Sequence, residues 1–159
     1  MLQSSGPVQS TYSRYEPVGS VGTPASETGY DVDTKIFEEN ASPAAGCGFG
    51  VAVYQGTADR GARIGGSGDF LGVTMANPTQ NVLSFTDAYA GGDNMPVMIR
   101  GDIWVIAEAA VTAGEALYAD ATTGVLGHSG GTLVVGGRWM TTAAAGQLAV
   151  LRLGSTAQA

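Results

Sequence analysis

The chain offers few residues that could perform chemistry, because it contains one cysteine and one histidine among 159 residues. Cys47 stands between Gly46 and Gly48, and His128 stands in the turn-like stretch Gly-His-Ser-Gly at residues 127–130. A cysteine nucleophile needs a neighbouring base, and the sequence suggests no third residue that would orient such a pair. We therefore expect Cys47 to be a buried or incidental thiol and His128 to be a solvated loop residue.

Other catalytic and metal-binding arrangements find equally little support. Ser129 is not part of a Gly-x-Ser-x-Gly motif, so a serine triad is not indicated. A transition-metal site would have to gather oxygen ligands from separate loops around the single histidine. The glycine-rich stretch 65–72 lacks the spacing and the following Lys-Ser/Thr of a phosphate-binding loop. We expect no enzymatic activity, no metal and no cofactor.

Two acidic pairs, Asp31/Asp33 and Glu38/Glu39, could in principle supply a general acid and a base. A catalytic carboxyl needs partial desolvation to raise its pKa. Both pairs lie in a stretch with few apolar residues, and such a stretch is not expected to form a pocket by itself. We expect all four carboxylates to be solvated charges.

The charge balance narrows the possible partners. Seven basic and 14 acidic residues give a net charge of −7, and only 13% of the residues are charged. Nucleic-acid backbones and anionic membrane surfaces are bound by clusters of Lys and Arg, whereas this chain has a single lysine, Lys35. No apolar run reaches 18 residues, the length needed to span a bilayer. We expect neither nucleic acid nor membrane as a partner.

The composition changes near residue 46. Residues 1–45 hold four of the six prolines and show no regular apolar period, whereas residues 46–159 contain repeated short apolar runs. The first segment could be a tail without fixed structure or an extended arm that docks on a partner or a neighbouring subunit. We favour the arm, because aromatic residues punctuate it and could anchor it. These expected partner-binding residues are Tyr12, Tyr15, Tyr30 and Phe37.

Residues 46–159 predict an all-β domain, a small β-barrel or sandwich of short antiparallel strands. Turn residues separate the apolar runs, and residues 147–153 are largely apolar on both alternating faces, as in a closed or sandwiched sheet. The expected strands are 49–54, 70–75, 82–85, 96–100, 103–107, 116–119, 132–135, 138–141 and 147–153.

Four stretches of this domain resemble the capsid cement, or head-decoration, proteins of tailed bacteriophages. They are Phe-Leu-Gly-Val-Thr at 70–74, Met-Ile-Arg-Gly-Asp-Ile-Trp-Val at 98–105, Val-Thr-Ala-Gly-Glu-Ala-Leu-Tyr-Ala-Asp at 111–120 and Thr-Gly-Val-Leu-Gly at 123–127. The resemblance covers roughly residues 46–155, and the arm matches only as a kind of element. The family has no catalytic residues to transfer to this sequence.

The resemblance implies a structural virion protein on the outer capsid surface that cements neighbouring major capsid protein subunits. Its partners would be the major capsid protein and further copies of itself, as a homotrimer or a dimer. Deleting residues 1–45 would then leave the β domain folded and abolish capsid binding. The alternative is a carbohydrate-binding or tail-associated β module that stacks sugars on Trp104, Trp139 and Tyr118; core packing is the competing explanation for these aromatics.

Overall fold

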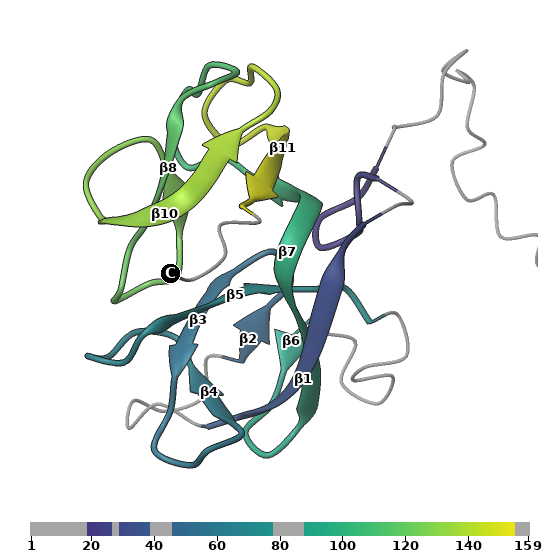
Figure 1. Cartoon of the computed structure of the whole chain (residues 1–159), viewed down its shortest axis with the longest axis vertical. Coiled ribbons are helices and arrows are strands. Elements are labelled where there is room, and N and C mark those ends of the chain that lie inside the picture. Colours follow the sequence, from purple (N-terminus) through teal and green to yellow (C-terminus); the bar gives the residue numbers. More distant parts are fainter. Residues whose placement is uncertain (1–18, 27–28, 39–45, 78–87, 155–159) are drawn as a thin grey trace, which may run out of the picture.

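A computed structural model describes residues 19–26, 29–38, 46–77 and 88–154. These residues form eleven strands and no helix, so the predicted all-β class is confirmed (Figure 1). The strands are β1 (Asp31–Phe37), β2 (Cys47–Gly48), β3 (Ala52–Gln55), β4 (Gly61–Arg63), β5 (Phe70–Thr74), β6 (Ala88–Tyr89), β7 (Asn94–Ile106), β8 (Ala116–Ala119), β9 (Leu126–Gly127), β10 (Thr132–Trp139) and β11 (Leu148–Leu153).

Five strands close into a small barrel. The pairing runs β1-β4-β3-β5-β7, and β7 pairs back with β1 to complete the ring. The β1–β4 pairing is parallel, and the other four pairings are antiparallel. Closure leaves fewer unpaired strand edges than an open sheet would have.

A second unit, here called the C-terminal sheet, shares β7 with the barrel. Residues 94–100 of β7 pair with β1 and β5, whereas residues 101–106 pair with β11. β10, β8 and β9 then follow β11 in order. Figure 1 shows the barrel strands below and β8, β10 and β11 above, connected by the long β7.

Two apolar clusters reflect the alternation of side chains along the strands. Val53 of β3 and Val97 of β7 lie in one cluster, together with Cys47 and Tyr89 from the separate β2–β6 pair. Ala52 and Tyr54 point to the opposite side of β3 and join the other cluster, which contains the inner side chains of the C-terminal sheet. The barrel wall is therefore apolar on both sides, because the C-terminal sheet packs against its outside.

Part of the predicted arm lies within this fold. β1 pairs with β7 over residues 31–36, and Phe37 is buried in the cluster with Val53 and Val97. Residues 22–25 also bond to β7: Gly22 N–H donates to the carbonyl of Trp104, and Trp104 N–H donates to the carbonyl of Thr23. The change in composition at residue 46 therefore does not coincide with the edge of the folded unit. This segment has too few apolar residues to fold by itself, and its pairing with a strand distant in sequence orders it.

The expected strand positions agree best in the C-terminal sheet. The strand at 116–119 is as predicted, and 147–153 begins one residue later. The expected pairs 96–100/103–107 and 132–135/138–141 are each a single strand, β7 and β10. The chain continues as one strand through Gly101 in β7 and through Gly136 and Gly137 in β10. The expected strand at 82–85 lies outside the described residues.

Candidate interaction surface

The predicted anchor residues are placed very differently in the structure. Tyr12 and Tyr15 lie outside the described residues. Tyr30 precedes β1 and is 39% exposed, so its ring is available to a partner. Phe37 is 2% exposed and packs in the barrel core, so its side chain is not available. Its position at the end of β1 gives it a core role that the arm interpretation did not anticipate.

The outer side of β1 carries an exposed apolar strip next to Tyr30. Val32 is 42% exposed and Ile36 39%, and these two side chains alternate with charged residues along the strand. Asp31 and Asp33, expected as solvated charges, form ion pairs with Arg100 at 2.8 Å and Lys35 at 3.0 Å. The hydrogen bond from Lys35 lowers the pKa of Asp33.

The C-terminal sheet presents a second exposed apolar surface, on the side away from the core. Directly opposite residues of neighbouring strands share a face, and the register places Ile106, Leu148 and Arg152 on this side, as well as Leu133. Ile106 is 43% exposed and Leu133 49%, and Val135, two residues along β10, is 71% exposed. We call this surface the outer face.

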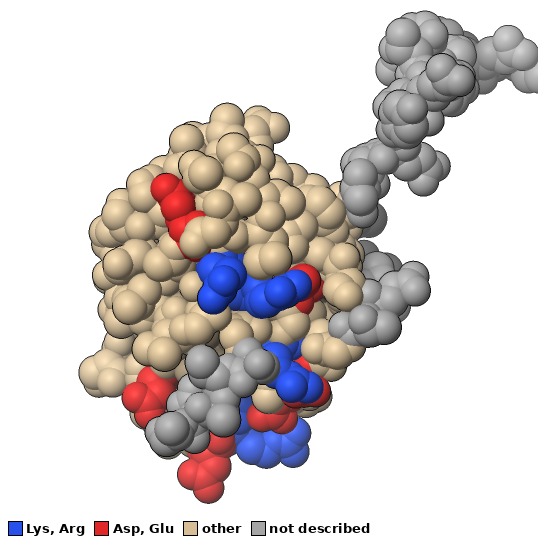
Figure 2. All heavy atoms as spheres, turned by 45° about the horizontal axis from the view of Figure 1, so that its top comes forward, with Lys and Arg blue, Asp and Glu red and all other residues tan. Residues whose placement is uncertain are grey.

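The outer face also holds two arginines directly across from each other. Arg138 of β10 pairs in register with Arg152 of β11. Arg152 donates to both carboxylate oxygens of Asp102, at 2.7 and 2.8 Å, and this contact raises its pKa. Arg138 is exposed, and its side chain has no hydrogen bond or ion pair with any residue that the structure describes. In Figure 2 the charged side chains form small groups separated by broad uncharged areas.

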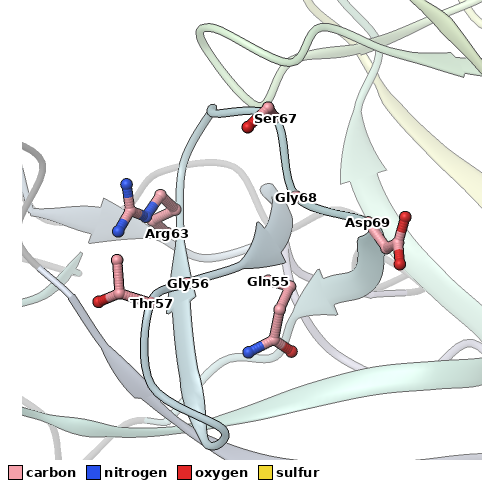
Figure 3. A pocket seen from close by; sticks show the side chains of 7 residues that line it. All are labelled: Gln55, Gly56, Thr57, Arg63, Ser67, Gly68 and Asp69. Atoms are coloured by element: carbon pink, nitrogen blue, oxygen red, sulfur yellow. The ribbon is translucent and has the colours of Figure 1, made fainter.

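A polar pocket of about 300 Å³ lies at the edge of the barrel (Figure 3). Its lining residues are Gln55, Gly56, Thr57, Arg63, Ser67, Gly68 and Asp69. They come from the ends of β3 and β4, from the loop between these strands and from the loop before β5.

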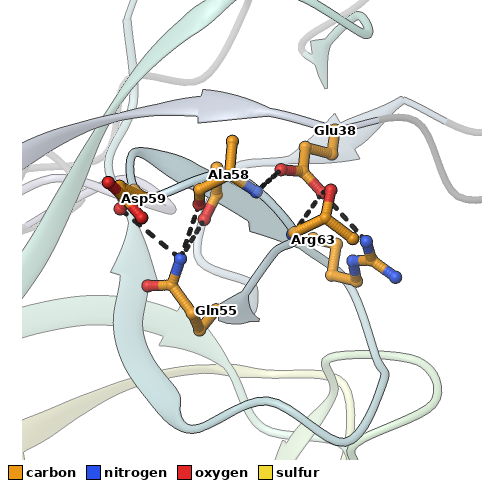
Figure 4. A network of polar contacts seen from close by, with 7 residues as sticks. Glu38, Gln55, Ala58, Asp59 and Arg63 are labelled. Carbon is orange, nitrogen blue, oxygen red and sulfur yellow. Dashed lines mark hydrogen bonds and ion pairs between the residues drawn. The ribbon is translucent and has the colours of Figure 1, made fainter.

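Glu38 organises the loop beside this pocket (Figure 4). Its carboxylate accepts hydrogen bonds from the backbone N–H groups of Thr57 and Ala58, both at 2.8 Å, and from Arg63 at 2.9 Å. These donors stabilise the ionised form and lower its pKa to about 2. The expectation of a solvated charge was therefore wrong for Glu38, which is a structural anchor of the β3–β4 loop; Glu39 lies outside the described residues.

The residues considered for catalysis do not form a site. Cys47 is fully buried, and its burial raises the pKa of the thiol to about 12, which opposes formation of a thiolate. His128 is half-buried rather than solvated, and its Nδ1 has no hydrogen-bond partner among the described residues. No group of three or more His, Cys, Asp or Glu in the described ranges could hold a metal ion.

The three aromatics of the sugar-stacking alternative do not form a platform. Trp139 is fully buried, and its indole N–H donates to the carbonyl of Gly127 at 3.0 Å. Trp104 and Tyr118 are half-buried. Core packing therefore explains Trp139, and a platform built on all three rings does not exist. Within the described part of the chain, no helix could cross a membrane.

Comparisons with known proteins agree with this architecture. One similar solved structure is a chain from the capsid of Myoviridae phage XM1, with a TM-score of 0.70 and 15% sequence identity; the match covers 94% of this chain and 99% of that chain. The head fiber gp8.5 N base of bacteriophage phi29 is a weaker match, with a TM-score of 0.42, 18% identity and coverage of 77% and 92%. No curated protein matches the chain.

At this level of identity the likeness to the XM1 chain shows a shared fold. Membership comes from the comparison with protein families, in which residues 8–154 match the family described as structural cement protein (E217 gp24/Pam3 gp6). The match spans the barrel, the C-terminal sheet and most of the predicted arm. The chain therefore belongs to the phage structural cement protein family, and its role is that of a capsid-associated structural protein.

Proposed function

We propose that this protein binds the outer surface of an assembled phage capsid and joins neighbouring major capsid protein subunits. The match of residues 8–154 to the structural cement family is the observation that carries this proposal. The outer position is supported by the net charge of −7, which opposes contact with packaged nucleic acid.

Capsid stabilisation would follow from mass action. A protein that binds the assembled shell more tightly than the free subunit shifts the equilibrium toward assembly. Many copies on one lattice multiply a modest contact area. Self-association as a homotrimer or dimer would add to this effect, since each oligomer could contact several subunits at once.

Two regions of the chain would make the contacts. The exposed residues Tyr30, Val32 and Ile36 beside β1 offer apolar contact area on the barrel. The second region is residues 1–18, which would act as an arm across the neighbouring subunit, with Tyr12 and Tyr15 as its contact residues. Tyrosine suits this role because its ring buries apolar area and its hydroxyl finds a hydrogen-bond partner.

Co-sedimentation tests the proposal directly. Purified chain is mixed with assembled capsids that lack it and, separately, with unassembled major capsid protein, and bound protein is quantified after centrifugation. We expect saturable binding to the capsids and little binding to the free subunit. Light scattering of the unbound protein measures its oligomeric state. A monomer that ignores assembled capsids would contradict the proposal.

A further inference from the structure

We propose that the outer face of the C-terminal sheet is a docking site for an acidic segment of the capsid shell, with Arg138 as its central contact. This inference rests on the proposed function, because it names the surface and the chemistry through which the protein would hold the shell. The outer face is formed by strands that lie outside the predicted arm, residues 1–45.

The arrangement of charges on the outer face favours a carboxylate partner. Like charges directly opposite each other on neighbouring strands are destabilising, yet Arg138 and Arg152 occupy such positions. Asp102 neutralises Arg152 through two hydrogen bonds. Arg138 has no such partner in the described structure. A carboxylate placed over Arg138 would complete two neighbouring Arg–carboxylate pairs and relieve the repulsion.

Apolar side chains beside the arginines favour a protein partner over a free ion. Ile106, Leu133 and Val135 of the same face are 43%, 49% and 71% exposed. Exposed apolar area next to arginine is typical of protein interfaces, in which arginine is enriched and lysine depleted. The occupant is therefore a polypeptide segment that combines a carboxylate with apolar side chains.

Charge also argues against a second copy of this chain as the occupant. The strand register places two arginines and one aspartate together on this face, Arg138, Arg152 and Asp102, whereas the whole chain has a net charge of −7. Two copies of a positive face brought together would repel each other. An acidic surface of a different protein complements the face in both charge and polarity.

Substitution of Arg138 tests the proposal in the full-length chain. Arg138→Ala and Arg138→Glu are titrated against assembled capsids that lack the protein. Arg138→Lys is the matched control, since it keeps a positive charge at the same position while the guanidinium is removed. We expect Arg138→Ala to weaken capsid binding by about tenfold, Arg138→Glu to weaken it further, and Arg138→Lys to keep more of the affinity than Arg138→Ala.

Val135→Asp provides a second test, because its side chain is 71% exposed and the substitution should not disturb the core. It should weaken binding while thermal unfolding stays unchanged. Wild-type binding by Arg138→Ala and Arg138→Glu, or a loss in Arg138→Lys equal to that in Arg138→Glu, would overturn the assignment and leave the proposed function standing. A changed oligomeric state with unchanged capsid affinity would also overturn it, since the face would then join copies of this chain. Failure of the wild-type protein to bind capsids would overturn both proposals.

Discussion

Glu38 shows how one side chain can determine the conformation of a loop. Its carboxylate accepts from two consecutive backbone N–H groups, the Thr57 hydroxyl and Arg63. In the sequence Glu38 is separated from Thr57 by 19 residues and from Arg63 by 25. No local motif reveals these contacts, because the parallel pairing of β1 with β4 brings the residues together.

We predict that Glu38 makes stability depend on pH in the acid range. The pKa is about 2 in the folded protein against an ordinary value of 4.5, so the folded state favours the ionised carboxylate. Its contribution to the free energy of unfolding is fully present above pH 4.5 and is lost as the pH falls toward 2. Urea unfolding of wild type and Glu38→Gln at pH 7, 4 and 2.5 measures this: the difference between the two proteins should shrink as the pH falls.

Asp59→Asn is the control for this experiment, because it removes an exposed carboxylate from the same loop. It should have little effect on stability at pH 7. A stability difference between Glu38→Gln and wild type that stayed constant from pH 7 to pH 2.5 would contradict the role assigned to Glu38.

Cys47 allows a second prediction at the residue scale. Its thiol is fully buried and its pKa is raised to about 12, so the reactive thiolate is scarce at pH 8. We expect a thiol reagent such as Ellman's reagent to label the native protein very slowly and the protein in guanidinium chloride rapidly. Native labelling as fast as that of the unfolded chain would show that the thiol is accessible.

At the scale of elements, β7 connects the two parts of the fold. Its pairing partners change around Gly101, from β1 and β5 before it to β11 after it. Gly101 has a φ of +126°, which side chains rarely adopt, and a Cβ there would meet the Cβ of Tyr30. Two strands, 96–100 and 103–107, were expected on either side of this position, whereas the chain continues through it as one strand.

We predict that Gly101→Ala destabilises the protein by ~3 kcal/mol or more, through backbone strain and steric overlap with Tyr30. Gly114→Ala separates these two effects, because Gly114 has a φ of +95° and open space around it. That variant should lose about 1 kcal/mol from backbone strain alone. Chemical denaturation measures both, and equal losses would contradict the close contact between Gly101 and Tyr30.

In the molecule as a whole, residues before position 46 are part of the folded unit, so the choice of truncation point affects folding. Residues 22–25 bond to β7, and β1 completes the barrel. Removing residues 1–45 would therefore remove a barrel strand and the buried Phe37. This differs from the expectation that such a deletion would leave the β domain intact.

We predict that a chain lacking residues 1–18 folds with near wild-type stability, whereas a chain lacking residues 1–45 loses its cooperative unfolding transition. Loss of the buried Phe37 side chain alone should lower the free energy of unfolding by about 3–5 kcal/mol. Circular dichroism during thermal unfolding compares the two truncations. The shorter deletion also tests the arm, since it should weaken capsid binding without unfolding the domain; undiminished binding would argue against an arm in residues 1–18.

Local patterns in the sequence were enough to predict the all-β class and the family resemblance. These depend on local patterns, namely short apolar runs, turn residues and the count of Cys, His and Lys. The strands at 116–119 and 148–153 could be located for the same reason.

The division of side chains into core and exposed could be read only from the three-dimensional arrangement of the strands. Phe37 was expected at a partner surface and lies in the barrel, whereas Arg138 and Arg152 are 14 residues apart and meet across two strands. Such placements depend on the register between strands distant in sequence, and a shift of one residue would turn every side chain to the opposite face. The burial of Phe37 and the paired arginines of the outer face follow from that register, which no local stretch of sequence specifies.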